Sequence, residues 1–313
     1  MSPAEPSPER RAPDAARADL LQPQELAALG GLEFTARQVV EGFIAGLHRS
    51  PHRGFSVEFA EHRMYQPGDD LRYIDWRMFG RSDRYYIKQF EEETNLRAYL
   101  LVDASASMAW SSSPETLPSK LWYAKQLAAS LALLLLRQGD AAGVVGFDDR
   151  TRAHVAARGG RRQWAELLRT LEHLPAGGRT DAGSALRDIA GRLRRRGLVI
   201  LISDLLVDPP STRLALRYLR HRGHEVLVFH LLDPGERELP GAGDVRFYDS
   251  ETNDELPVSV ADLRIEYREA VTAALAEWRT ELVPQGIDYV LVDTAQALVH
   301  ALRAYLRKRE RLG

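Results

Sequence analysis

The chain has 313 residues, with 42 Lys and Arg against 44 Asp and Glu, so its formal net charge is −2. This balance gives no electrostatic reason to expect nucleic acid or an anionic membrane as a partner. There is no cysteine, which excludes disulfides, thiolate catalysis and cysteine-ligated zinc.

Residues 1–19 are rich in Pro, Ala, Ser and charge, a composition typical of a disordered tail. They lack the apolar core of a signal peptide. The most apolar stretch, residues 127–136, is about half the length that spans a bilayer. We therefore expect a cytoplasmic protein without a membrane span, in which this stretch belongs to a buried helix.

Residues 20–95 form a predicted N-terminal extension. Short helices are expected at residues 23–29 and 35–47, and the second is amphipathic. Strand-like alternation follows at residues 55–59 and again at 84–92, within a segment crowded with charged and aromatic side chains.

Residues 96–313 alternate between predicted strands and helices, the pattern of a parallel sheet covered by helices. We therefore predict an α/β fold with a doubly wound, mostly parallel sheet. The expected strands are one that ends at residue 103 and those at residues 143–147, 151–155, 198–202, 225–231 and 287–292. The expected helices are residues 119–138, 161–173, 183–196, 211–222, 261–282 and 295–309. A hairpin insertion is expected within residues 233–260, with strands at 245–248 and 256–260.

The most informative residues follow the first of these strands. Asp103, Ser105 and Ser107 alternate with small residues directly after a run of apolar ones. Their side chains offer only oxygen, which suits a hard cation such as Mg²⁺. An ordinary strand-to-helix turn capped by serine explains the same residues without a metal.

Two more oxygen-bearing residues fall at comparable places. Thr180 lies in a Gly-rich loop before a helix, and Asp204 ends the strand to which that helix leads. If the chain reverses its winding direction between the strands that end near Asp103 and Asp204, those strands lie side by side. Their carboxyl ends then flank a cleft of the kind where open α/β sheets bind ligands.

Together these five residues resemble the metal-ion-dependent adhesion site of von Willebrand factor A domains. The resemblance implies that Ser105, Ser107 and Thr180 bind Mg²⁺ or Mn²⁺ directly. It implies that Asp103 and Asp204 balance the charge as outer members of the site. In those domains a carboxylate from a partner completes the coordination of the ion.

Residues upstream of these five narrow the resemblance to one bacterial family. The stretch from Arg63 through Gln66-Pro67-Gly68-Asp69-Asp70-Leu71-Arg72 to Asp75-Trp76, with Lys88-Gln89-Phe90-Glu91-Glu92-Glu93 after it, is similar to the bacterial family called domain of unknown function 58. Members place this signature directly before a von Willebrand-type domain. The family implies a partner role beside MoxR-type AAA+ ATPases. We therefore expect an adaptor or chaperone component whose client carries an exposed Asp or Glu.

The signature also offers a second candidate surface. Pro67 and Gly68 predict a turn, with mixed acidic and basic residues around it. Bidentate pairs among these charges would lock the loop onto the α/β domain. Alternatively, the loop contacts a partner directly, with its aromatic residues as anchors. The candidate partner-binding residues are Arg63, Asp69, Asp70, Arg72, Asp75 and Trp76.

Two other functions stay open at this point, a metal-dependent hydrolase and a nucleic-acid-associated variant of the fold. No nucleophile or general base has recognisable context beyond the ligands, and there is no Gly-Lys-Ser/Thr phosphate loop. The basic run at residues 192–196 complements a helix dipole instead of forming a phosphate-binding surface. Asp148 and Asp149 could approach the metal, but a hairpin turn explains them. We therefore expect a binding module and no catalytic activity.

Overall fold

The computed structural model describes residues 31–49, 62–64, 79–80, 84–88, 96–178, 181–193, 195–239, 241, 243–248 and 255–311. The predicted tail at residues 1–19, the helix at 23–29 and the strand at 55–59 lie outside these residues. Within the predicted N-terminal extension, β1 (His62–Met64) pairs with β2 (Tyr86–Lys88) in an antiparallel ribbon.

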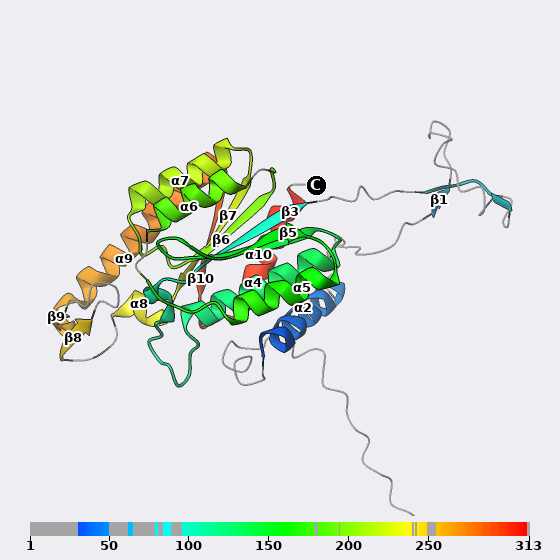
Figure 1. The fold of residues 1–313 in the computed structure, drawn as a ribbon. Coiled ribbons are helices and arrows are strands. Elements are labelled where there is room, and N and C mark those ends of the chain that lie inside the picture. The colour runs from blue at the N-terminus through cyan, green and yellow to red at the C-terminus, as the bar shows by residue number, and fades with distance from the viewer. Residues whose placement is uncertain are drawn as a thin grey trace, which may run out of the picture.

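A six-stranded sheet occupies the centre of the molecule (Figure 1), with the strand order β10-β7-β6-β3-β4-β5. Neighbouring strands are parallel except β4 and β5, which form an antiparallel hairpin at one edge. The strands are β3 (Arg97–Asp103), β4 (Ala141–Phe147), β5 (Thr151–Arg158), β6 (Leu198–Ser203), β7 (Glu225–Leu232) and β10 (Ile287–Asp293). These observations confirm the predicted α/β class and the mostly parallel sheet.

The chain reverses its winding direction at β3. From β3 it passes to β4 on one side, and after the hairpin it crosses to β6 on the other side. As a result β3 and β6 are hydrogen-bonded neighbours, with Leu100 opposite Ile200 and Val102 opposite Ile202. The carboxyl ends of both strands therefore lie at the same edge of the sheet, as the sequence predicts.

Helices cover both faces of the sheet (Figure 1). The first face carries α2 (Leu32–Arg49), α4 (Lys120–Arg137), α5 (Arg161–Glu172) and α10 (Val299–Glu310). The second carries α6 (Ala182–Arg192), α7 (Pro209–His221) and the C-terminal end of α9 (Val260–Leu282). Alternate residues of β3 supply both cores, since Leu100 and Val102 face the first layer while Tyr99 and Leu101 face the second.

The apolar stretch 127–136 lies in α4, as predicted. Thirteen of the residues from Leu121 to Leu135 are buried, because α4 lies between the sheet and α2. Each fully buried leucine contributes about 1.5–3 kcal/mol of transfer free energy. In the part of the chain that the structure describes, no helix combines the length and the apolar character needed to cross a membrane.

The remaining elements differ in detail from the sequence prediction. The hairpin of the insertion is present as β8 (Asp244–Tyr248) and β9 (Glu255–Ser259). It is preceded by a short helix, α8 (Pro234–Glu238), that we did not predict. The last helix begins at Val299 instead of residue 295, because the Asp293 side chain accepts a hydrogen bond from the Ala295 backbone and holds a turn there.

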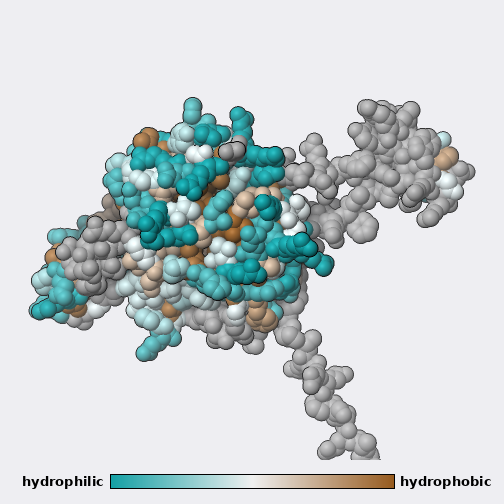
Figure 2. Space-filling model, viewed as in Figure 1, coloured by the Kyte–Doolittle hydropathy of each residue, from teal (hydrophilic) through white to brown (hydrophobic). Residues whose placement is uncertain are grey.

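The outer faces of the helices are polar. Figure 2 shows mainly hydrophilic residues over α5, α6 and α7. Their buried residues instead recur at helical spacing on the opposite side, for example Leu167 and Leu171 of α5. This pattern explains how short helices of low overall hydrophobicity pack on the sheet.

Candidate metal-binding site

The ends of β3 and β6 meet at the carboxyl edge of the sheet. Asp103 is the last residue of β3 and Ser203 the last of β6, and both are fully buried. The Ser203 hydroxyl donates a hydrogen bond of 2.6 Å to Oδ2 of Asp103. Asp204 follows directly and is buried as well. Two predicted site residues, Asp103 and Asp204, are therefore brought to one place.

The two predicted serine ligands lie together beside Asp103. The Ser105 backbone N–H donates to Oδ1 of Asp103 over 2.9 Å, which turns the chain out of the strand. A short 3₁₀ helix, η3 (Ala106–Ala109), then begins. It places the hydroxyl of Ser107 3.1 Å from that of Ser105.

This spacing fits a small divalent cation. Mg²⁺ binds oxygens at about 2.1 Å in octahedral geometry, so two neighbouring oxygens lie about 3.0 Å apart. The hydroxyls of Ser105 and Ser107 are hydrogen-bonded to each other at 3.1 Å, a distance close to that edge. Ser105 is buried and Ser107 is partly exposed, so one of the two hydroxyls reaches the surface.

Thr180 lies outside the described residues. The loop that leads to it is hydrogen-bonded to the turn that carries Ser105 and Ser107. The Gly177 N–H donates to the carbonyl of Ala104 at 2.9 Å. The Ala106 N–H donates to the carbonyl of Gly178 at 3.2 Å. Gly178 also has a φ of 81°, and a Cβ there would meet the Asp148 carboxylate.

A buried lysine contacts the second carboxylate. Lys120, the first residue of α4, donates a 2.7 Å hydrogen bond to Oδ2 of Asp204. Its ammonium also contacts the carboxylate of Glu236 on α8, and the Lys120 side chain is 0% exposed. With Asp103, these residues form a cluster of three carboxylates and one ammonium. With all three carboxyls ionised, this cluster has two more negative charges than positive ones, and a divalent cation would neutralise them.

The charges in this cluster shift one another's ionisation. Burial, and then repulsion by Asp204, raise the pKa of Asp103 to about 7. Burial would lower the pKa of Lys120, but attraction by Asp204 and Glu236 outweighs it and raises that pKa. Burial raises the pKa of Glu236 despite the nearby ammonium. The site therefore holds more negative charge than its own residues stabilise.

The loop that presents Asp204 has a strained backbone. Leu205 is buried with a φ of 51°, a left-handed conformation that costs a leucine about 1 kcal/mol or more. Its N–H donates to the Ser203 hydroxyl at 3.0 Å, and the Leu206 N–H donates to Oδ1 of Asp204 at 3.2 Å. Strained backbone conformations of this kind are found most often at functional sites.

Within the described residues, no cluster of three or more His, Asp or Glu side chains could hold a metal by itself. The oxygen site therefore depends on hydroxyls as well as carboxylates. Burial lowers the pKa of the nearby His230 to about 4, so its imidazole adds no positive charge. The His230 ring is hydrogen-bonded to the Tyr289 hydroxyl, and the Ser203 hydroxyl donates to Asp103.

The other sequence candidates are Asp148, which borders Gly178 of the loop bonded to Ala106, and residues of the upstream signature. Asp148 sits in the β4–β5 turn, where its carboxylate accepts from the Arg150 N–H and pairs with Arg152, as the hairpin interpretation predicts. Of the candidate partner-binding residues, Arg63 has its backbone in β1. The others, Asp69, Asp70, Arg72, Asp75 and Trp76, lie outside the described residues.

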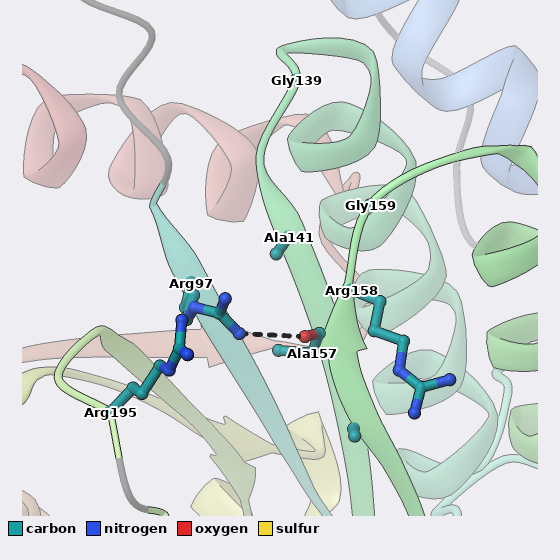
Figure 3. Close-up of a pocket in the computed structure, with 8 residues that line it drawn as sticks. Arg97, Gly139, Ala141, Ala157, Arg158, Gly159 and Arg195 are labelled. Atoms are coloured by element: carbon teal, nitrogen blue, oxygen red, sulfur yellow. Dashed lines mark hydrogen bonds between the residues drawn. The ribbon is translucent and has the colours of Figure 1, made fainter.

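A separate hollow of about 900 Å³ opens at the other end of the strands (Figure 3). Its lining consists of small residues and three arginines, Arg97, Arg158 and Arg195. Arg97 begins β3, whereas Asp103 ends it. The hollow is therefore not part of the candidate metal site.

The family profile described as "Protein of unknown function DUF58" matches residues 61–277. The chain belongs to this family. The match covers the sheet from β3 to β7, both serines, both aspartates, Lys120 and Glu236. It agrees with the resemblance seen in the sequence, and the family's description assigns no activity.

Relatives in three Mycobacterium species are themselves called uncharacterized proteins. Uncharacterized proteins from Mycobacterium tuberculosis and Mycobacterium bovis are each 35% identical over 243 residues, which cover 77% of this chain and 75% of the relative. An uncharacterized protein from Mycobacterium avium is 32% identical over 161 residues, covering 50% of this chain and 94% of its own.

Solved structures with a similar arrangement are more distant. The conserved hypothetical protein BatB from Bacteroides thetaiotaomicron is 17% identical with a TM-score of 0.45, covering 69% of this chain and 99% of its own. A von Willebrand factor type A protein from Catenulispora acidiphila is 21% identical with a TM-score of 0.33, covering 43% of this chain and 33% of its own.

The sequence analysis missed three residues of the site, which are Ser203, Lys120 and Glu236. A signal existed for Glu236, because Asp233-Pro234-Gly235-Glu236 is a capping-box pattern with Pro at the first helical position. Lys120 begins a helix, where a cation opposes the helix dipole. That unfavourable placement is itself a signal that nearby carboxylates compensate for it.

Proposed function

We propose that this chain is a metal-dependent protein-binding module. Ser105, Ser107 and Thr180 would hold Mg²⁺ or Mn²⁺, with Asp103 and Asp204 balancing its charge. The observation that carries the proposal is the 3.1 Å pair of serine hydroxyls beside a buried cluster of three carboxyls and one ammonium. The bound ion would act as a Lewis acid with a position open to an outside oxygen ligand.

The chemistry of the donors indicates what the partner offers. Hydroxyls are neutral ligands, so the ion would stay short of anionic oxygen at the partly exposed Ser107 side. A partner Asp or Glu carboxylate would supply that oxygen, together with Coulombic attraction at a partly desolvated edge. Without the ion, Asp103 and Asp204 would repel the same carboxylate.

We further propose that the module works beside a MoxR-type AAA+ ATPase, as an adaptor or chaperone component that presents a client. The choice of partner rests on the resemblance described from the sequence, which implies this partner for the domain of unknown function 58 family to which the chain belongs. The candidate residues around 63–76 would offer a second contact surface.

The metal is tested by isothermal titration of EDTA-treated protein with Mg²⁺ and Mn²⁺. Binding should be abolished when Ser105→Ala and Ser107→Ala are combined. Ser113→Ala is a matched control, because Ser113 is exposed and lies a few residues farther along the chain. Unchanged binding in the double variant would refute this ligand set.

The partner is tested by capture of the cognate ATPase or its client with and without EDTA. Both EDTA and Asp204→Ala should weaken capture. The double variant Ser105→Ala with Ser107→Ala, which leaves the buried Lys120–Asp204 pair intact, should weaken capture with unchanged circular dichroism. Capture at full strength in EDTA would move the contact to residues 63–81. Metal-dependent turnover of phosphate or peptide esters, lost in the same variants, would assign hydrolysis to the site instead.

A further inference from the structure

Lys120 is buried in a place that does not favour a positive charge by itself. It is the first residue of α4, where the helix dipole repels a cation. Its side chain has no exposure, so the ammonium has lost its hydration. Attraction by the carboxylates of Asp204 and Glu236 holds it there, and the Trp110 ring lies 6.0 Å from the ammonium as well.

Glu236 is held independently of the lysine. The second carboxylate oxygen of Glu236 accepts from the Asp233 N–H at 2.9 Å in a capping box. The Glu236 carbonyl accepts from the Tyr267 hydroxyl on α9 at 2.7 Å. Asp233 in turn accepts from the Ser112 N–H at 3.1 Å, which ties α8 to the loop after the serines. Glu236 is therefore a fixed counter-charge.

These contacts make Lys120 a competitor for Asp204. One oxygen of the Asp204 carboxylate is bonded to the lysine and the other to the Leu206 N–H. A divalent cation at the serines would attract the same carboxylate and would be repelled by the ammonium. Because the Lys120 ammonium also pairs with Glu236, the attraction between Lys120 and Asp204 is weaker than it would be in an isolated pair.

We propose that Lys120 is a built-in cation that limits the affinity of the site for a divalent metal, and that Glu236 opposes it. The inference rests on the proposed function, because it concerns the same site. It assigns to both residues a positioning role that acts through Asp204. Neither residue is proposed to be a ligand of the metal.

The two substitutions have opposite expected effects. Lys120→Met removes the competing charge and frees Asp204, so Mg²⁺ should bind about tenfold more tightly or better. Glu236→Gln removes a negative charge and leaves the lysine wholly to Asp204, so Mg²⁺ should bind about tenfold more weakly. A merely structural role would weaken binding in both variants alike.

The experiment is isothermal titration of the full EDTA-treated chain with Mg²⁺ alone, with thermal unfolding to check the fold. Lys120→Arg keeps the charge and should keep the wild-type affinity. Lys125→Met removes an ammonium from the same helix, where Lys125 donates to the Glu172 carbonyl at 3.4 Å and is attracted by the Glu172 carboxylate. Glu238→Gln removes an exposed carboxylate from the same short helix. Both controls should leave the affinity within about twofold of wild type.

Shifts of opposite sign in Lys120→Met and Glu236→Gln support the inference. Unchanged affinity in both, or weaker binding in both, overturns it while serine-dependent metal binding by the wild type still stands. If Lys120→Met does not fold, the sign of the Glu236→Gln shift decides, since tighter or equal binding contradicts the inference. Loss of serine dependence in the wild type would instead refute the proposed function.

Discussion

The Ser203 hydroxyl and the Asp103 carboxylate are joined by a 2.6 Å hydrogen bond across one hundred residues of sequence. The bond exists because β3 and β6 are neighbours, although β4 and β5 come between them along the chain. It links the two halves of the candidate site at the point where the winding reverses.

Replacing Ser203 by Ala should therefore destabilise the metal-free protein. The change leaves the buried Asp103 carboxylate and the Leu205 N–H each short of one partner. We expect a loss of about 1–3 kcal/mol in the free energy of unfolding, measured by urea denaturation in EDTA. Ser113→Ala, at an exposed position, is the control. A loss no larger than that of the control would mean that the hydrogen bond contributes nothing.

The fold could be predicted from the sequence because its signals are local. β3, β6 and α4 are apolar runs of the right length. The sequence analysis stated the neighbouring of β3 and β6 only as a condition, and the strand order meets it. The short helix α8 carries a capping-box signal that we overlooked. The start of α10 was placed too early, because an Asp293 turn follows β10 before the helix begins.

The site was only partly predictable, for a physical reason. Asp103, Ser105 and Ser107 stand together in sequence, so their common role is visible. The partners of Lys120 lie 84 and 116 residues away, and burial depends on contacts that no local pattern contains. A lysine at a helix start therefore resembles any surface charge until the fold is known.

A second buried lysine predicts a pH effect away from the site. Lys308 pairs with Glu225 at 2.6 Å and with Asp288 at 2.8 Å. Burial opposes ionisation of both carboxyls, but Lys308 and the neighbouring arginines outweigh it, so the pKa of each is lowered. A lowered pKa in the folded state contributes stability at neutral pH that is lost as the pH falls below about 4.

Lys308→Met should accordingly cost about 1–2 kcal/mol at pH 7 and clearly less at pH 3, measured by denaturant unfolding at both values. The matched control is Arg311→Met. Arg311 also contacts Asp288, but its side chain is 63% exposed, so its loss should cost under about 1 kcal/mol. An equal cost of Lys308→Met at both pH values would contradict the assignment.

In the hairpin at the edge of the sheet, the backbone of β5 lies close to Gly143 of β4. A Cβ at Gly143 would lie 2.7 Å from the backbone of Ala157 and of Val155 on β5. Gly143→Ala should therefore destabilise the protein by about 1–3 kcal/mol, as seen in thermal unfolding. Gly159→Ala is the control, because its nearest neighbour would be the Asp140 carbonyl at 3.8 Å. Equal melting temperatures for the two variants would show that the strands separate without cost.

Two exposed apolar residues near the candidate metal site lead to a prediction about partner binding. Trp110 is 39% exposed and Leu206 is 56% exposed. Trp110 lies three residues after Ser107 and packs near Gly235, and Leu206 lies two residues after Asp204. Exposed large apolar side chains that border a polar site are typical of interface hot spots.

Trp110→Ala and Leu206→Ala should each weaken Mg²⁺-dependent capture of the cognate ATPase or client about tenfold or more, because each removes apolar contact area at the rim of the site. Leu206 offers the metal no oxygen, so the Mg²⁺ affinity of Leu206→Ala should stay within about twofold of wild type. The Mg²⁺ affinity of Trp110→Ala is measured in parallel, because the Trp110 ring lies 6.0 Å from the Lys120 ammonium. Leu214→Ala on α7 is the matched control, because Leu214 is also 56% exposed and is not close in sequence to any residue of the candidate metal site.

If capture keeps its full strength in both variants while still requiring Mg²⁺, the partner contacts the ion without contacting Trp110 or Leu206. The contact area would then have to come from residues 63–81.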